Sequence, residues 1–139
     1  KGIARKYMIS GDSEAPLNTM ADCGSYLVNR FIGQRNEVVM LLCLDAKRAP
    51  LCCRIVSEGS VNAAEISTRK VVETALTSNA TSVILAHNHP GGIALPSPED
   101  IATTRNIKSA LQPMGIVLMD HIIVAGEDSV SMALSGVDF

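Results

Sequence analysis

Short, nearly uninterrupted apolar runs constrain the fold of this chain more than any other feature. Residues 38–44 are entirely apolar, and residues 81–86 and 116–124 form two further stretches that are mostly apolar. A membrane-spanning helix needs about 20 apolar residues, whereas runs of this length are typical of buried strands. We therefore predict that these three ranges are strands within a sheet.

Segments with the apolar spacing of a helix lie between the predicted strands. They cover about residues 18–32, 68–78 and 98–111. Each begins at a side chain that can cap a helix, namely Asn18 or Thr19, Ser67 and Ser97. Further strands are predicted at about 50–57 and 129–134. This alternation predicts an α/β (α+β) layered domain, in which a mixed β-sheet is flanked by helices.

The composition fits a single domain and argues against a role in nucleic-acid binding. The chain has 139 residues, of which 47% are hydrophobic and 3% aromatic, so aliphatic side chains and Met must fill the core. We assign residues 1–17 to a loose N-terminal lead-in and residues 18–139 to the domain. The net charge of -2 offers no basic surface, so we expect no direct DNA binding by this domain.

The expected location follows from segments that the sequence lacks. No apolar run approaches the length of a membrane span, and the first ten residues lack the apolar region of a signal peptide. The four cysteines, Cys23, Cys43, Cys52 and Cys53, form no C-x-x-C pattern and are expected to be reduced. We therefore predict a cytoplasmic protein without a membrane partner. Whether it forms a homo-oligomer is left open.

Two histidines lie one residue apart where the strand over residues 81–86 is expected to end. His87 and His89 point to the same side of an extended backbone, so both imidazoles can reach one ion. Asp100 falls in the first turn of the helix that begins after Ser97. Two neutral imidazoles and a carboxylate form a three-ligand zinc site whose fourth position is left for water. We therefore predict one Zn²⁺ at His87, His89 and Asp100.

Each part of this motif also has a simpler interpretation. Ser97 and Asp100 have the spacing of a helix capping box, which needs no function, and an isolated H-x-H pair is weak evidence for a metal. An HNH nuclease is disfavoured because the surrounding ββα-metal pattern and a basic surface are missing. A zinc deaminase is excluded because no P-C-x-x-C follows an H-x-E. The combination of both histidines with Ser97 and Asp100 favours the metal site.

The pattern H-x-H-P, six residues, then S-x-x-D resembles the JAMM motif of MPN-type metallopeptidases, and the flanking residues resemble the RadC family in particular. The resemblance covers about residues 20–139 and includes these segments: Glu37-Val38, Leu44-Asp45, Gly59-Ser60-Val61-Asn62, Arg69, Ala86-His87-Asn88-His89-Pro90, Pro96-Ser97, Glu99-Asp100 and Asp120-His121-Ile122-Ile123. It implies the MPN/JAMM layered fold, which is cytidine-deaminase-like. The chain departs from the family pattern at Gly91, where Ser is usual, and at Ser67-Thr68, where His-Pro is usual.

The same resemblance implies an activity and assigns roles to residues. It implies a zinc-dependent metallohydrolase, metallopeptidase-like or isopeptidase-like, in which a metal-activated water attacks an amide. His87, His89 and Asp100 would bind the ion. Glu37 would transfer protons and Ser97 would stabilise the oxyanion. Spacing alone does not choose the base from the glutamates, which include Glu37, Glu58, Glu65 and Glu73. The substrate would be a peptide or isopeptide of unknown identity.

Two residues and two other functions stay open at this point. His121 is either a partner that orients a ligand or an ordinary satisfied histidine on a strand. Arg69 either pairs with a carboxylate of the site or lies on a helix surface. The alternatives to hydrolysis are a non-catalytic MPN-like scaffold or interaction module, and a DNA-repair-associated accessory role that only the family's name suggests.

Overall fold

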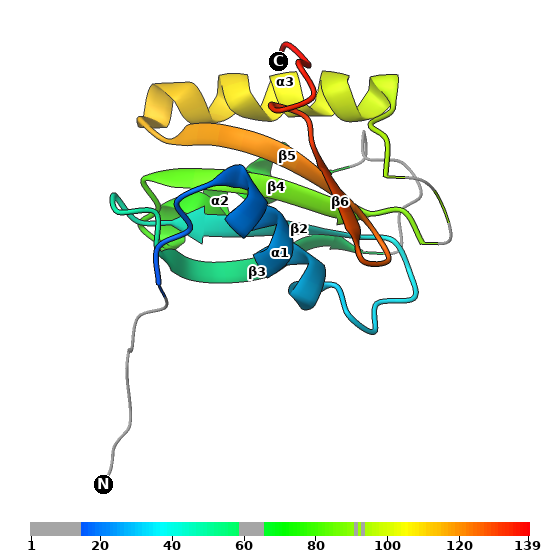
Figure 1. The fold of residues 1–139 in the computed structure, drawn as a ribbon. Helices are drawn as coiled ribbons and strands as arrows, with labels where there is room; N and C mark the ends of the chain where they lie inside the picture. The colour runs from blue at the N-terminus through cyan, green and yellow to red at the C-terminus, as the bar shows by residue number, and fades with distance from the viewer. Residues whose placement is uncertain (1–14, 59–65, 91, 93) are drawn as a thin grey trace, which may run out of the picture.

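The computed structural model describes residues 15–58, 66–90, 92 and 94–139 (Figure 1). Its elements are α1 Met20–Arg30, β2 Val38–Leu44, β3 Pro50–Glu58, α2 Thr68–Thr77, β4 Ser82–Asn88, α3 Pro98–Leu111, a 3-10 turn Gln112–Met114, β5 Val117–Ala125 and β6 Asp128–Ser131. Each element predicted above therefore has a counterpart. Most of the predicted lead-in lies outside the described residues, as do residues 59–62 and Gly91, so the predicted domain boundary stays a prediction.

The described strands form one mixed sheet in the order β3-β2-β4-β5-β6. Within it β4 and β5 run parallel, and the other neighbouring strands run antiparallel. All residues of β2 and β4 are buried, which explains why their sequences are continuous apolar runs rather than an alternation. The predicted α/β class with a mixed sheet flanked by helices is confirmed.

Helices cover both faces of this sheet (Figure 1). Alternate side chains of β2 and β4 point to opposite faces. Leu41 and Leu85 pack in a cluster with residues of α2 and α3, whereas Leu42 and Ile84 pack with Leu27 of α1. Full burial of such a side chain contributes about 1.5–3 kcal/mol. The same period of two continues from Leu85 to residues 87 and 89, which therefore belong to the face covered by α2 and α3.

Side-chain caps begin the helices where the sequence predicts them. Thr19, rather than Asn18, caps α1 and accepts a hydrogen bond from the backbone N–H of Asp22. Ser67 caps α2 in the same way, and Ser97 caps α3. These oxygens satisfy backbone donors that have no partner within the helix. The start of α3, which carries part of the predicted motif, is therefore defined locally.

Two strand ends differ from the prediction by more than one residue. β4 continues beyond Ala86 to Asn88, because His87 still pairs in register with Val39 of β2 and Ile123 of β5. β6 ends at Ser131 rather than at residue 134, because residues 132–136 form turns. Met132, the first of these turn residues, is fully buried. His87 therefore lies on the strand itself, not after it.

Two further features concern the chain as a whole. The cysteines, all of which fall among the described residues, are free thiols. No helix in the described part of the chain is long and apolar enough to cross a membrane.

Candidate metal centre

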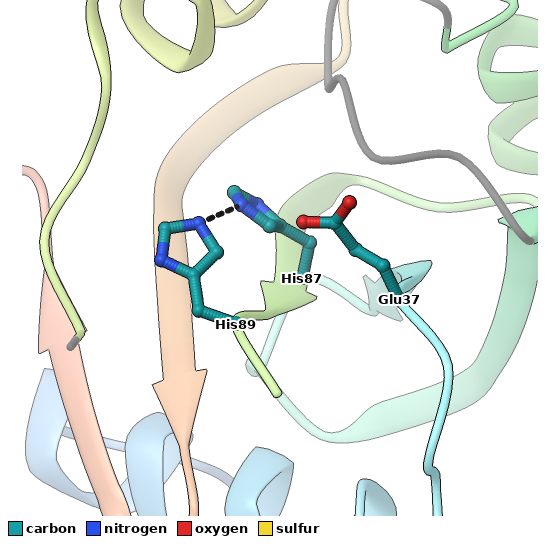
Figure 2. Close-up of side chains that lie close together, drawn as sticks. All are labelled: Glu37, His87 and His89. Atoms are coloured by element: carbon teal, nitrogen blue, oxygen red, sulfur yellow. Dashed lines mark hydrogen bonds between the residues drawn. The ribbon is translucent and has the colours of Figure 1, made fainter. Parts of the chain in front are cut away.

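Two imidazoles meet at the end of β4. His87 is the second-last residue of that strand and is buried, and His89 follows the strand with its side chain 23% exposed. Their Nε2 atoms lie 2.8 Å apart (Figure 2). The structure therefore brings together the two nitrogens that the i, i+2 spacing on an extended backbone directs to one side.

The Asp100 carboxylate approaches the same point from the start of α3. Its Oδ1 lies 3.4 Å from His87 Nε2, and its Oδ2 lies 3.9 Å from His89 Nε2. Oδ2 also accepts the Ser97 backbone N–H at 2.8 Å, while Ser97 Oγ accepts the Asp100 backbone N–H at 3.0 Å. This is the capping box considered above. The capping box does not compete with the metal site. It holds the Asp100 carboxylate in the orientation in which that carboxylate lies beside both histidines.

Glu37 completes a cluster with both histidines. It lies just before β2, on the face that Val39 shares with His87, and its carboxylate points towards the imidazoles (Figure 2). One carboxylate oxygen of Glu37 and one ring nitrogen from each of His87 and His89 all lie within 4.8 Å of one another. Of the other glutamates that spacing left open, Glu73 lies on the exposed surface of α2 and Glu65 is outside the described residues.

Asn88, the residue between the histidines, holds the segment that carries Glu37. Its Oδ1 accepts the Val38 backbone N–H at 2.8 Å, and its Nδ2 donates to the Asn36 carbonyl oxygen at 3.1 Å. Asn88 is 5% exposed; its bond to Val38 is buried, and its bond to the exposed Asn36 is partly buried. One side chain thus bonds the backbone on either side of Glu37. Sequence reasoning missed this role, although the register Val39–His87 makes Val38 the neighbour of Asn88.

The inner nitrogen of His87 has a partner of its own. His87 Nδ1 lies 2.8 Å from Nε2 of His121 on β5, and His121 Nδ1 lies 2.6 Å from Thr104 Oγ1 on α3. His121 and Thr104 are both fully buried. His121 is therefore in direct contact with a predicted ligand. Sequence reasoning missed Thr104, whose signal is its position four residues after Asp100, on the same face of α3.

Burial sets the protonation of these groups. It lowers the pKa of His87 to about 4, with His89 acting in the same direction and Asp100 opposing it, and it lowers the pKa of His121 well below its usual value. Both imidazoles are therefore neutral at pH 7, which is the form that binds a metal ion. Burial also raises the pKa of Glu37, opposed by His89 and assisted by Asp100, which makes this carboxylate more basic.

These lowered pKa values predict how the stability of the metal-free protein depends on pH. The unfolded chain takes up protons on His87 below about pH 6.5, whereas the folded protein resists protonation down to about pH 4. The free energy of unfolding should therefore be greatest above pH 6.5 and fall as the pH drops through this window. Urea denaturation with chelator present, at about pH 7 and about pH 5.5, measures the loss. A His87→Asn variant should lose less stability over the same interval, and equal losses would contradict the prediction.

The donor set fits a divalent metal of the zinc type. Neutral imidazole nitrogens and carboxylate oxygens are zinc ligands, and here two nitrogens and two carboxylates converge. Glu37 and His89 also line a hollow of about 440 Å³, together with Arg35, Asn36 and Pro90. The cluster is thus enclosed on the His87 side and accessible from solvent on the Glu37 side. An accessible side is what a catalytic ion needs for water or substrate.

Two of the residues singled out in the sequence, Ser97 and Arg69, are not among the side chains that meet at the candidate metal centre. The described hydrogen bond of the Ser97 side chain belongs to the capping box with Asp100, and the part of Ser97 as an oxyanion donor stays a prediction. Arg69 pairs with Glu73 one turn further along α2, with its Nε 3.3 Å from Glu73 Oε2 and its side chain 88% exposed. Arg69 therefore takes the helix-surface role, and an exposed pair of this kind contributes little stability.

Comparison with known proteins agrees with the fold. The family model described as the RadC-like JAB domain matches residues 17–137. The chain therefore belongs to the family of RadC-like JAB domains.

The relatives described next are named UPF0758 proteins, a name that states no activity. It is 44% identical over 135 residues to a UPF0758 protein of Pseudoalteromonas translucida, covering 96% of this chain and 60% of the relative. It is 38% identical over 136 residues to a UPF0758 protein of Stenotrophomonas maltophilia, covering 96% and 58%. A UPF0758 protein of Bordetella parapertussis is 44% identical over 115 residues, covering 79% and 51%. The chain thus spans between half and three fifths of the length of these curated relatives.

Proposed function

We propose that this domain is a zinc-dependent metallohydrolase of the metallopeptidase or isopeptidase class, which hydrolyses an amide with an activated water. One observation carries the proposal. The Nε2 atoms of His87 and His89 lie 2.8 Å apart, with the carboxylates of Asp100 and Glu37 beside them and a hollow on the Glu37 side. Membership in the RadC-like JAB family supports the same class.

In this proposal the residues divide into those that hold the metal and those that handle protons. His87, His89 and Asp100 hold Zn²⁺. When bound, the ion supplies Lewis-acid chemistry, lowering the pKa of a water towards about 7 and polarising a carbonyl. Glu37 accepts the proton of the attacking water and delivers it to the leaving amine, a task that its raised pKa suits.

Ser97 supports the reaction in a second way in this proposal. Its Oγ accepts the Asp100 backbone N–H, so the hydroxyl hydrogen is not used in that bond. That hydrogen is assigned to the oxyanion that develops on the substrate carbonyl. The substrate is a peptide or isopeptide, and it enters through the hollow beside Glu37 and His89. The net charge of -2 provides no support for direct binding to DNA.

Protein purified without added zinc should contain close to one equivalent, or take up one equivalent on titration. Elemental analysis and calorimetric titration measure this content. Chelation should lower the melting temperature, because an ion that binds only the folded state stabilises it. Less than about 0.2 equivalents, with no uptake on titration, would contradict the assignment.

A further inference from the structure

We propose that Thr104 and His121 form a buried hydrogen-bond relay that fixes the tautomer of His87, so that His87 presents an unprotonated Nε2 to the metal centre. This inference deepens the proposed function and rests on it for the identity of the ion. It assigns Thr104 and His121 as positioning residues. The relay itself is a property of the metal-free protein and can be tested there.

The relay connects three elements through atoms shielded from water. Thr104 Oγ1 lies 2.5 Å from the Asp100 carbonyl oxygen and 2.6 Å from His121 Nδ1. His121 Nε2 lies 2.8 Å from His87 Nδ1. Thr104, His121 and His87 are at most 1% exposed. Asp100 and Thr104 lie on α3, His121 on β5 and His87 on β4, so the chain of bonds runs from one ligand to another through the core.

The direction of the relay follows from the first contact. A carbonyl oxygen can only accept, so the Thr104 hydroxyl must donate to Asp100, since two oxygens 2.5 Å apart without a hydrogen between them would repel. Its single hydrogen is then used, and Thr104 Oγ1 must accept the hydrogen on His121 Nδ1. The nearby Met132 sulfur, 4.0 Å from Thr104 Oγ1, offers no competing hydrogen.

His87 and His121 are at most 1% exposed, and a charged imidazole this far from water is disfavoured, so both rings are neutral. A neutral His121 with its hydrogen on Nδ1 has a bare Nε2, which accepts the hydrogen of His87 Nδ1. A neutral His87 with its hydrogen on Nδ1 has a bare Nε2, the atom that faces His89 and Asp100. The opposite direction would protonate His87 Nε2, which would then donate to His89 and block the site.

A second contact holds His121 in place for this task. The Asp120 carboxylate, which is fully buried, accepts the backbone N–H of His121 at 2.8 Å and that of Ala133 at 3.0 Å. It also accepts the hydroxyl of Ser131 on β6. The backbone of β5 at His121 is therefore tied to the turn that follows β6. Because its backbone is held in this way, the His121 imidazole keeps the orientation in which it contacts His87.

The test combines a tautomer measurement with a zinc affinity. Thr104→Val removes the hydroxyl at nearly constant shape, Thr104→Ser keeps it, and Thr103→Val removes a buried hydroxyl from the adjacent position of α3. Nitrogen NMR of the wild type, made metal-free with a chelator, should show His87 protonated at Nδ1 and unprotonated at Nε2. In Thr104→Val that preference should weaken. Zinc affinity, measured by chelator competition, should fall by about 10–100-fold in Thr104→Val and stay near wild type in the other two variants.

The outcomes separate the relay from the proposed function. A hydrogen on His87 Nε2 in the metal-free wild type would overturn the relay. So would a Thr104→Val variant that keeps both the wild-type tautomer and the wild-type affinity while folded by circular dichroism. A wild type that takes up no zinc would remove the proposed function, and the NMR result would still decide the relay. If Thr104→Val fails to fold, His121→Gln, read by the same NMR signals of His87, provides the second variant.

Discussion

A Glu37→Gln variant is expected to bind zinc as the wild type does and to hydrolyse amides about 10²–10⁴-fold more slowly. Gln keeps the length and shape of the side chain, but its amide does not accept a proton from water near pH 7. The loss should therefore appear in kcat rather than in metal content. Cleavage of a mixed peptide library, followed by mass spectrometry, measures the rate, and elemental analysis measures the zinc.

Glu73→Gln is the matched control for this experiment. Glu73 is an exposed glutamate on α2 that pairs with Arg69 across one helical turn, so its removal should leave both zinc and hydrolysis unchanged. Full hydrolysis in Glu37→Gln would remove Glu37 from the mechanism. Loss of zinc together with hydrolysis would make Glu37 a ligand instead of a base, an arrangement that its position within 4.8 Å of both histidines makes geometrically accessible.

The second large effect is expected at Asp100. Asp100→Ala should weaken zinc binding by more than about 100-fold, because it removes a direct ligand where loss of a supporting partner alone costs about 10–100-fold. It should also lower the free energy of unfolding by about 1 kcal/mol, because the Ser97 backbone N–H loses its acceptor. Chelator competition measures the first effect, and urea denaturation of the metal-free protein measures the second.

Asp22→Ala separates these two effects. Asp22 and Thr19 form the same capping box at the start of α1, where Asp22 is exposed. The Asp22 variant should therefore lose a similar amount of stability from its helix start and retain wild-type zinc affinity. If both variants bind zinc equally well, Asp100 caps its helix and is not a ligand.

The layered fold could be predicted because local and long-range signals agree. The apolar run over residues 38–44 reads as a two-sided buried strand, and β2 lies between β3 and β4 with all its residues buried. Ser67 and Ser97 act as the predicted caps, since a cap is a contact within one turn of chain. Strand ends were less predictable. His87 and Asn88 are polar, but the register with β2 and β5 keeps them in the sheet.

The order of the strands could not be read from the sequence. The helix α3 between β4 and β5 is typical of a parallel pair, but it does not show that these two strands are neighbours. That pairing matters for the site. It places His121 beside His87, although the two residues are 34 positions apart in the sequence.

Within the site, prediction succeeded where the residues are close in sequence. His87 and His89 come together through strand geometry, and Asp100 is oriented by a capping box with Ser97, three positions earlier in the sequence. Glu37 was chosen by resemblance alone, because its approach depends on the pairing of β2 with β4. The sequence did not reveal Thr104, because its contact with His121 joins α3 to β5, which are not neighbours within one turn of chain. The local signal for Thr104 is its position four residues after Asp100.

The geometry of the site depends on an intact amide at Asn88. Its oxygen end accepts the Val38 N–H and its nitrogen end donates to the Asn36 carbonyl, so the two ends are not interchangeable. Deamidation would turn the residue into Asp, which has no hydrogen to donate in its ionised form and would set a carboxylate oxygen against the carbonyl of Asn36. The segment carrying Glu37 would then be pushed from the histidines, although Glu37, His87, His89 and Asp100 would all be chemically intact.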